Sequence, residues 1–188
     1  MITDLNHYIK HFDNFLDKEI CNQTIIEIEK CKWEQHNFYD NNEKKYDTRS
    51  GEQELDITWQ NVPSVDVIMK KIWFALKSYI EYINFNWFDT WTGYSQIRFN
   101  RYTNNKKMAM HCDHIHSLFE GNKKGIPLLS VLGTLNDNYI GGDFIMFKDK
   151  KINLKQGDLI IFPSIFLYPH KVEPVTRGTR YSYISWVW

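Results

Sequence analysis

The C-terminal stretch, residues 157–188, reads GDLIIFPSIFLYPHKVEPVTRGTRYSYISWVW and decides the fold class. Glycines at 157 and 178 each precede a run of apolar and β-branched or aromatic residues, which is typical of a turn that leads into a strand. Pro169 fixes its own φ and biases the residue before it toward extended geometry, so the chain after it is expected to be extended. The predicted strands are Leu159–Phe162, His170–Pro174 and Arg180–Trp188.

Further short strands with turn signals between them are expected upstream of this stretch. The run LLSVLGTL at Leu128–Leu135 is largely apolar, as a buried strand would be, and Gly141-Gly142 marks a turn. Several short strands with turns between them predict an antiparallel sandwich or barrel. The predicted strands here are Tyr94–Tyr102, Leu128–Leu135 and Asp143–Phe147.

Two amphipathic helices are predicted before these strands. Asp17 is suited to cap a helix that runs to about Lys32, and Ser64 to cap a longer one. The apolar face of each helix needs a large apolar surface to cover it, most naturally a sheet. Between them, the polar and irregular segment from Trp33 to Asn61 predicts a long loop or loose hairpin. The predicted buried stripes are Ile20, Thr24, Ile25, Ile28 and Cys31, then Val65, Ile68, Met69, Ile72, Trp73, Leu76, Tyr79, Ile80 and Ile83.

The length of 188 residues fits a single domain, in which residues 1–92 form a helical support with a loop and residues 93–188 form the core that carries the chemistry. The 23 basic residues balance the 23 acidic ones. This balance gives no electrostatic basis for unspecific binding to nucleic acid or to anionic membranes.

Cysteine usage and the N-terminal sequence bear on the compartment. The three cysteines, Cys21, Cys31 and Cys112, form no CxxC pair and no even-numbered framework, which favours a reducing environment. We find neither a secretory leader pattern at the N-terminus nor an apolar run long enough to span a bilayer. We therefore expect a cytoplasmic protein without a membrane partner.

The central motif is His111-Cys112-Asp113. Residues two apart on a strand point to the same side, so His111 and Asp113 can converge on one point while Cys112 faces away. His170, at the head of a predicted strand, is the candidate for a second histidine. Two histidines and one carboxylate form the facial triad that leaves three positions open on a non-haem Fe(II) ion.

Two neighbouring histidines are rival ligands. His114 alternates to the wrong face if the strand continues, and His116 reaches the metal only if the chain bends. A zinc hydrolase site made of His111, Asp113 and His116 is the corresponding alternative. Strand alternation together with the residues that follow His170 favours the iron site.

Arg180 and Ser182 lie on one face of the last predicted strand. A guanidinium grips a carboxylate through two donors, and a hydroxyl adds a hydrogen bond, so the pair suits the distal carboxylate of 2-oxoglutarate. Residues 174–178 are expected to turn this strand back beside that of His170. Tyr102 ends another strand whose polar face (Tyr94, Gln96, Arg98, Asn100 and Tyr102) either lines the pocket or meets water.

At this point the sequence resembles the 2-oxoglutarate/Fe(II) dioxygenases, in particular their prolyl 4-hydroxylase-like branch. The resemblance covers nearly the whole chain: HFDNFLDKEICNQTIIEIEK, QIRFNRYTNNKKMAMHCDH and GTLNDNYIGGDFIMF are similar to that branch. Residues 157–188 carry the most specific match, with a distal histidine, Pro-Val-Thr-x-Gly, a basic residue, a serine and a tryptophan.

The resemblance implies a mostly β fold, a double-stranded β-helix or jelly roll supported by N-terminal helices. It implies Fe(II) as cofactor, 2-oxoglutarate and O₂ as cosubstrates, and ascorbate as a further candidate cofactor. The implied iron ligands are His111, Asp113 and His170, with Arg180 and Tyr102 as cosubstrate contacts beside Ser182 and with Trp186 packed near the pocket.

The implied function is hydroxylation of an organic substrate, with a peptidyl proline first. Alternatives are the same chemistry on a free amino acid, a small metabolite or a nucleobase, and a non-catalytic jelly-roll binding module. The chain departs from the family pattern at Arg180 (lysine in animal and plant members), Met108 (often tyrosine) and Asn105 (often glycine). Substrate access is expected between the loops at residues 35–61 and 114–127, where Tyr39 and Tyr46 are candidates to stack on a proline ring.

Overall fold

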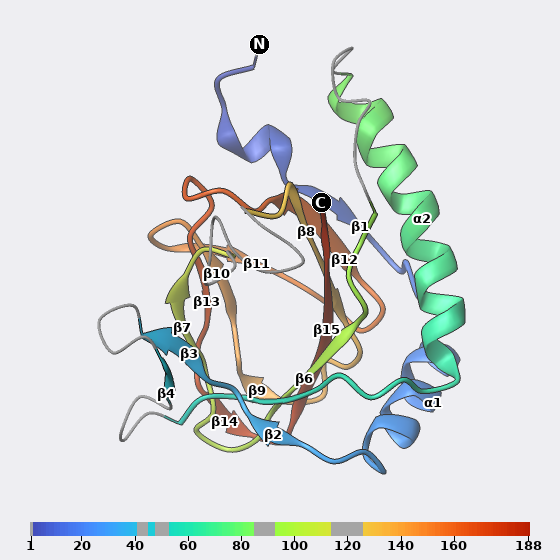
Figure 1. Cartoon of the computed structure of the whole chain (residues 1–188), viewed down its shortest axis with the longest axis vertical. Helices are drawn as coiled ribbons and strands as arrows, with labels where there is room; N and C mark the ends of the chain where they lie inside the picture. Colours follow the sequence, from blue (N-terminus) through green and yellow to red (C-terminus); the bar gives the residue numbers. More distant parts are fainter. Residues whose placement is uncertain (1, 41–44, 48–52, 85–92, 114–125) are drawn as a thin grey trace.

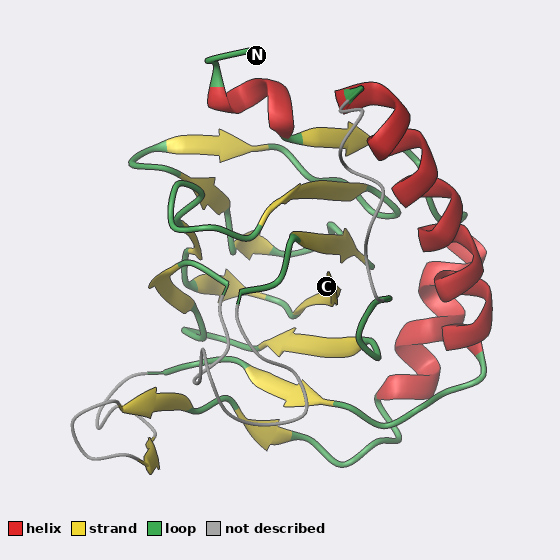
Figure 2. Ribbon diagram, turned by 45° about the horizontal axis from the view of Figure 1, so that its top comes forward, coloured by secondary structure: helices red, strands yellow, loops and turns green. Residues whose placement is uncertain are grey.

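The computed structural model describes residues 2–40, 45–47, 53–84, 93–113 and 126–188. Two antiparallel sheets face each other, and both main helices lie outside one of them (Figures 1 and 2). The larger sheet has seven strands in the order β1-β12-β8-β15-β6-β5-β2, and the smaller has four in the order β11-β10-β13-β7. This is the jelly roll with N-terminal helical support that the sequence predicts.

The described elements follow one another from an N-terminal turn of helix to a long last strand. They are η1 (Leu5–Tyr8), β1 (Lys10–Phe12), α1 (Lys18–Ile28), β2 (Glu34–Gln35), β3 (Phe38–Asp40), β4 (Lys45–Asp47), β5 (Asp56–Thr58), α2 (Ser64–Ile83), β6 (Arg98–Tyr102), β7 (Met108–His111), β8 (Leu129–Thr134), β9 (Ile140–Gly141), β10 (Phe144–Met146), β11 (Lys150–Ile152), β12 (Leu159–Pro163), β13 (His170–Val172), β14 (Val175–Arg177) and β15 (Arg180–Val187).

The seven-stranded sheet separates two apolar cores. Side chains alternate along its strands, so that on β8 Val131 packs toward the helices while Leu132 packs toward the smaller sheet. The outer core joins this sheet to α1 and α2. The inner core lies between the two sheets and includes Phe144 and Val172 from the smaller one. The inner face is the one on which the predicted site residues must meet.

Both helices form where the sequence predicts them, with differences at their ends. The side chain of Asp17 makes no capping hydrogen bond, and α1 ends at Ile28 rather than near Lys32. The cap of α2 is Pro63, so Ser64 is its first helical residue and not its cap. Trp73 is 41% exposed, since the stripe of α2 continues through Ala75 and Leu76 instead. No described helix is long and apolar enough to cross a membrane.

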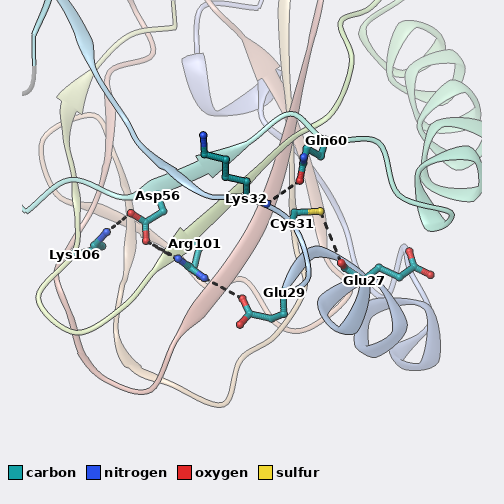
Figure 3. Close-up of polar contacts among 8 residues, drawn as sticks. All are labelled: Glu27, Glu29, Cys31, Lys32, Asp56, Gln60, Arg101 and Lys106. Carbon is teal, nitrogen blue, oxygen red and sulfur yellow. Dashed lines mark hydrogen bonds and ion pairs between the residues drawn. The ribbon is translucent and has the colours of Figure 1, made fainter.

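The polar segment between the helices is more ordered into strands than its composition indicates. Strands β3 and β4 pair as a hairpin, in agreement with the predicted loose hairpin. Strand β5, however, adds to the seven-stranded sheet beside β6, with Ile57 opposite Asn100. Arg101, on the outer face of β6, joins these parts through contacts to Asp56 of β5 and to Glu29 just after α1 (Figure 3).

One prediction about strand order is wrong. Residues 174–178 were expected to fold the strand of Arg180 back beside that of His170. Instead β14 pairs with β9, and β15 runs between β6 and β8 in the other sheet. The connection therefore crosses from one sheet to the other, so that His170 and Arg180 lie on facing walls instead of neighbouring strands.

Candidate metal centre and its cavity

Three side chains converge between the two sheets. His111 ends β7 and His170 begins β13, and the two residues are directly paired across these strands. Nε2 of His111 lies 3.4 Å from Oδ1 of Asp113, and Nε2 of His170 lies 3.8 Å from the same oxygen. One ligand atom from each residue lies within 4.8 Å of the others. This spacing suits a single metal ion held by two nitrogens and one oxygen.

Backbone carbonyl groups orient both imidazole rings. Nδ1 of His111 is 2.8 Å from the carbonyl oxygen of Ala109, and Nδ1 of His170 is 3.0 Å from that of Tyr168. Because a carbonyl oxygen only accepts, each Nδ1 carries the proton and each Nε2 presents its lone pair to the shared centre. Such outer hydrogen bonds fix the tautomer of a metal-binding histidine.

The carboxylate of Asp113 is oriented in a comparable way. The hydroxyl of Ser130 donates to Oδ2 over 2.5 Å, and it lies 2.7 Å from that of Ser164. Oδ1 is thereby left to face the histidines. Asp113 is buried, as are both serines, so the three groups hold one another in place away from water.

The protonation states also suit metal binding. Burial lowers the pKa of His170 to about 4, with the neighbouring His111 acting in the same direction, so this ring is neutral at pH 7. Burial alone would raise the pKa of Asp113, but His170, His111 and the Ser130 hydroxyl together hold it well below its usual range. A neutral imidazole and an ionised carboxylate are the ligand forms that a divalent cation requires.

Arg180 lies in the wall opposite the histidines and is fully buried. Its Nη1 donates to Oγ of Ser182 over 3.0 Å, and the guanidinium carbon sits 4.9 Å from the centre of the Tyr102 ring. Nε and Nη2 have no hydrogen-bond partner among the described residues. A buried cation with two open donors is costly unless an anion completes it, so the arrangement fits the distal carboxylate of a dicarboxylic acid.

The fold leaves room for the Arg180 side chain. Gly142 has φ +63°, and a Cβ there would lie 3.1 Å from Cδ of Arg180 and 3.0 Å from Cγ2 of Val175. Glycine adopts this backbone geometry without strain and also avoids the close contact. Gly142, which was predicted only as part of a turn, therefore also leaves space for the Arg180 side chain.

The polar side chains that lie within β6 face inward, toward the smaller sheet. Arg98, Asn100 and Tyr102 share the inner face, because Tyr102 lies under Arg180 and Nε of Arg98 donates to Oδ1 of Asn100 over 3.0 Å. The guanidinium carbon of Arg98 lies 5.0 Å from the centre of the Trp186 ring. These three side chains therefore lie on the inner face of the sheet, with Trp186 packed beside Arg98, and the lining of a pocket by this row stays a prediction.

Sequence reasoning missed two residues at the centre. Ser130 is a polar residue inside the largely apolar run of β8. This break in the apolar pattern is the signal that could have identified it. His36 is buried, and its pKa falls to about 3 through burial, with the charges of Arg98 and His111 adding to the effect. His36 lies in the irregular segment between the helices, where no periodicity marks an inward-facing residue.

A second histidine–carboxylate group lies at the other end of the larger sheet. His11, Asp13 and Asp158 have ligand atoms within 4.8 Å of one another. Asp158, however, already accepts from the backbone amides of Asn14 and Lys155 and contacts His11 over 3.0 Å. These bonds join β1 to the turn before β12, which accounts for the group structurally.

The rival ligands His114 and His116 lie outside the described residues, as does most of the loop at residues 114–127. The side chains of Tyr39 and Tyr46 also lie outside the described part. Access between these loops therefore stays a prediction.

With this geometry in place, known families can be compared with the chain. The sequence model of the 2OG-Fe(II) oxygenase superfamily matches residues 97–188, which carry the three converging side chains and Arg180. Residues 97–188 are therefore similar to that superfamily. The likeness implies Fe(II), 2-oxoglutarate and O₂, and the N,N,O ligand set and the open guanidinium donors fit the first two.

Curated relatives match about half of the chain. A PKHD-type hydroxylase of Idiomarina loihiensis is 32% identical over 96 residues, which are 50% of this chain and 42% of that protein. A PKHD-type hydroxylase of Xylella fastidiosa is 37% identical over 100 residues, 48% of this chain and 43% of its own. The match thus spans less than half the length of these relatives.

Solved structures match over nearly the whole chain. A prolyl hydroxylase of Trichoplax adhaerens, in complex with a peptide of hypoxia inducible factor, has a TM-score of 0.73 at 19% identity and covers 98% of this chain and 85% of its own. A prolyl-4-hydroxylase of Pseudomonas putida has a TM-score of 0.67 at 19% identity, with coverages of 96% and 92%. This chain therefore shares their fold.

Proposed function

We propose that this chain is an Fe(II)- and 2-oxoglutarate-dependent hydroxylase that acts on prolyl residues of peptides or proteins. The observation that carries the proposal is the convergence of His111, Asp113 and His170 opposite a buried arginine whose donors are open. A binding module would have no need for three ligands that leave metal positions free. The prolyl substrate is supported by the structural neighbours that are prolyl hydroxylases, and by the prolyl 4-hydroxylase-like branch that the sequence resembles.

The protein's own residues would divide the work between the two walls. His111, Asp113 and His170 would hold Fe(II) through Nε2, Oδ1 and Nε2, in the orientations that Ser130 and the backbone carbonyls set. Arg180 would bind the distal carboxylate of 2-oxoglutarate. Ser182 accepts from Arg180, and its own hydroxyl hydrogen stays available for the same carboxylate.

Tyr102 would support this carboxylate pocket by packing its ring against the guanidinium. Burial raises the pKa of Tyr102, so the phenol stays protonated and can donate. When bound, iron and 2-oxoglutarate would supply the oxidising chemistry that places oxygen on a C–H bond. The closed inner core would exclude water from that chemistry.

Three further parts of the proposal concern the whole chain. Residues 1–188 would act as one domain, supported by the outer core that joins the helices to the catalytic sheet. Ascorbate would serve as an auxiliary reductant. A cytoplasmic location is supported by the three cysteines, which form no disulfide and so fit a reducing compartment.

The test is turnover by purified protein with Fe(II), 2-oxoglutarate and a library of proline-containing peptides. We expect succinate release and a mass gain of one oxygen on proline. Release of succinate without any modified peptide would keep the chemistry and reject the prolyl substrate. Absence of succinate in all conditions would reject the enzyme.

A further inference from the structure

A second arginine on the inner wall is not used by the proposed iron and cosubstrate sites. Arg98 lies on β6, four residues before Tyr102. Tyr102 is paired with Arg180 of the neighbouring strand β15. Strands rise about 3.3 Å per residue, so the two arginines stand at levels roughly 13 Å apart along the sheet. Arg98 is opposite Ile184 of β15, two residues before Trp186. Trp186 is in turn opposite Ser130 of β8, whose hydroxyl donates to Asp113. Arg98 therefore lies near the candidate metal centre rather than near Arg180.

The guanidinium of Arg98 is only partly satisfied. Nε donates to Asn100, and we find no carboxylate within ion-pair distance of Arg98 among the described residues. Trp186 and Trp59 flank it, with ring centres 5.0 Å and 6.0 Å from the guanidinium carbon. Nε1 of Trp186 is buried and likewise has no partner in the described part of the chain. Several donors are thus left open on one wall.

The other charges of the proposed site sum to zero, so the positive charge of Arg98 has no opposite charge left to balance it. A divalent ion, the carboxylate of Asp113, a dicarboxylate and Arg180 cancel one another when both histidines are neutral. Burial lowers the pKa of Arg98, although the charges of Asp113 and Tyr102 oppose this, and an arginine stays cationic near neutral pH. Asp113 cannot neutralise Arg98 as well, because a metal ion would take up its charge.

Resting on the hydroxylase function proposed above, we propose that Arg98, with Trp59 and the indole N–H of Trp186, forms a subsite for a carboxylate of the substrate. The substrate would then carry a carboxylate next to the carbon that is oxidised. This carboxylate would be the α-carboxylate of a free amino acid, the C-terminal carboxylate of a peptide, or an acidic side chain. Guanidinium groups bind carboxylates through charge-assisted hydrogen bonds, and the flanking indoles would shield such a pair from water.

Binding of small probes tests the subsite without turnover. The protein would be loaded with Zn(II), which has no redox chemistry, and saturated with 2-oxoglutarate to fill the Arg180 pocket. Calorimetry would compare N-acetylproline with its amide, and N-acetylglycine with its amide. We expect each acid to bind about 10- to 100-fold more tightly than its amide, the gain typical of hydrogen bonds between charged groups.

Variants on the two faces of β6 provide matched controls. Arg98→Met should remove the preference for the acids, and Arg98→Lys should keep part of it. Arg101→Met removes the same charge from the outer face, where Arg101 contacts Asp56 and Glu29 (Figure 3), and should behave as the wild type. Unchanged 2-oxoglutarate affinity and melting temperature in Arg98→Met would exclude a general structural loss.

The outcomes separate this inference from the hydroxylase proposal. Equal binding of acids and amides, no binding of either acid, or an unchanged preference in Arg98→Met would overturn the carboxylate subsite. A preference for N-acetylglycine over its amide supports the subsite even if no prolyl peptide is hydroxylated. Peptides ending in proline with a free or amidated C-terminus, and peptides with internal Pro-Asp or Pro-Asn, would identify the source of the carboxylate. Hydroxylation of both members of each pair at equal rates would reject the inference and keep the enzyme.

Discussion

The four-stranded wall of the candidate site differs from the seven-stranded wall in how its polar groups are satisfied. Beside the metal centre, His111 and His170 each have Nδ1 bonded to a carbonyl, and Asp113 has one oxygen bonded to Ser130. On the opposite wall, Arg180 keeps two buried donors without partners among the described residues. The first wall is preorganised by hydrogen bonds within the protein, one of them from Ser130 on β8 of the facing sheet, whereas the second depends on a bound anion to complete it. Loss of a residue should therefore have different consequences on the two walls.

The largest effect is expected from removing a ligand on the preorganised wall. His170→Ala, and equally His111→Ala, should reduce succinate release to about a thousandth of wild type or less, because two remaining ligands do not hold the ion in an open site. His7→Ala, on η1 at the far end of the chain, is the matched control and should keep activity. Substantial turnover by His170→Ala would remove that residue from the metal centre.

Arg180 tests the other wall and should change two properties in opposite directions. Arg180→Met should weaken 2-oxoglutarate binding about 100-fold, since two charge-assisted hydrogen bonds are lost. The same variant should raise the free energy of unfolding of the ligand-free protein by about 1–3 kcal/mol, because an unpaired buried charge is replaced by an apolar chain.

Calorimetry and urea unfolding measure the two effects of the Arg180 variant. Arg177→Met, which removes an exposed arginine three residues earlier, should change neither. A ligand-free Arg180→Met protein that is less stable than wild type would contradict the contrast between the walls.

Ser130 shows how much the outer hydrogen bonds contribute to the metal centre. Ser130→Ala removes the donor to Asp113 and should weaken metal binding about 10- to 100-fold. Ser164→Ala should have a smaller effect, since Ser164 contacts Ser130 and reaches Asp113 only through it. Titration with a divalent metal measures both, and equal losses in the two variants would argue against direct orientation of Asp113 by Ser130.

The smallest effect concerns pH. The folded-state pKa values of His170 and His36 are lowered to about 4 and about 3, whereas unfolded histidines titrate near about 6.5. The unfolded chain thus binds more protons below that value, so stability falls as pH decreases. We expect the metal-free protein to lose about 1 kcal/mol of unfolding free energy between pH 7 and pH 6. His36→Gln should lose about half as much, and a pH-independent wild type would contradict buried neutral histidines.

The site residues were predictable because their signals are local. Strand alternation predicted that His111 and Asp113 would converge, and the position of His170 at the head of a strand made it the candidate for the third ligand. The geometry now places these three side chains together, with Arg180 on the facing wall.

The features that the sequence did not predict depend on how strands far apart in the chain pair with one another. The direct donor from Ser130 to Asp113 follows from the place of β8 beside β15 and facing the metal ligands, which no local pattern encodes. The error in strand order has the same origin, since a turn signal at residues 174–178 does not say which sheet the next strand joins. His36 was missed because strand β2, which it follows, is only two residues long.

Anaerobic titration with Fe(II), followed by 2-oxoglutarate, tests the central arrangement most directly. The predicted result is one ion per chain in wild type and in Arg180→Met, with no tight binding in Asp113→Ala. Addition of 2-oxoglutarate should then give tight binding in wild type alone. Unchanged Fe(II) affinity in Asp113→Ala, or unchanged 2-oxoglutarate affinity in Arg180→Met, would contradict the two-walled site.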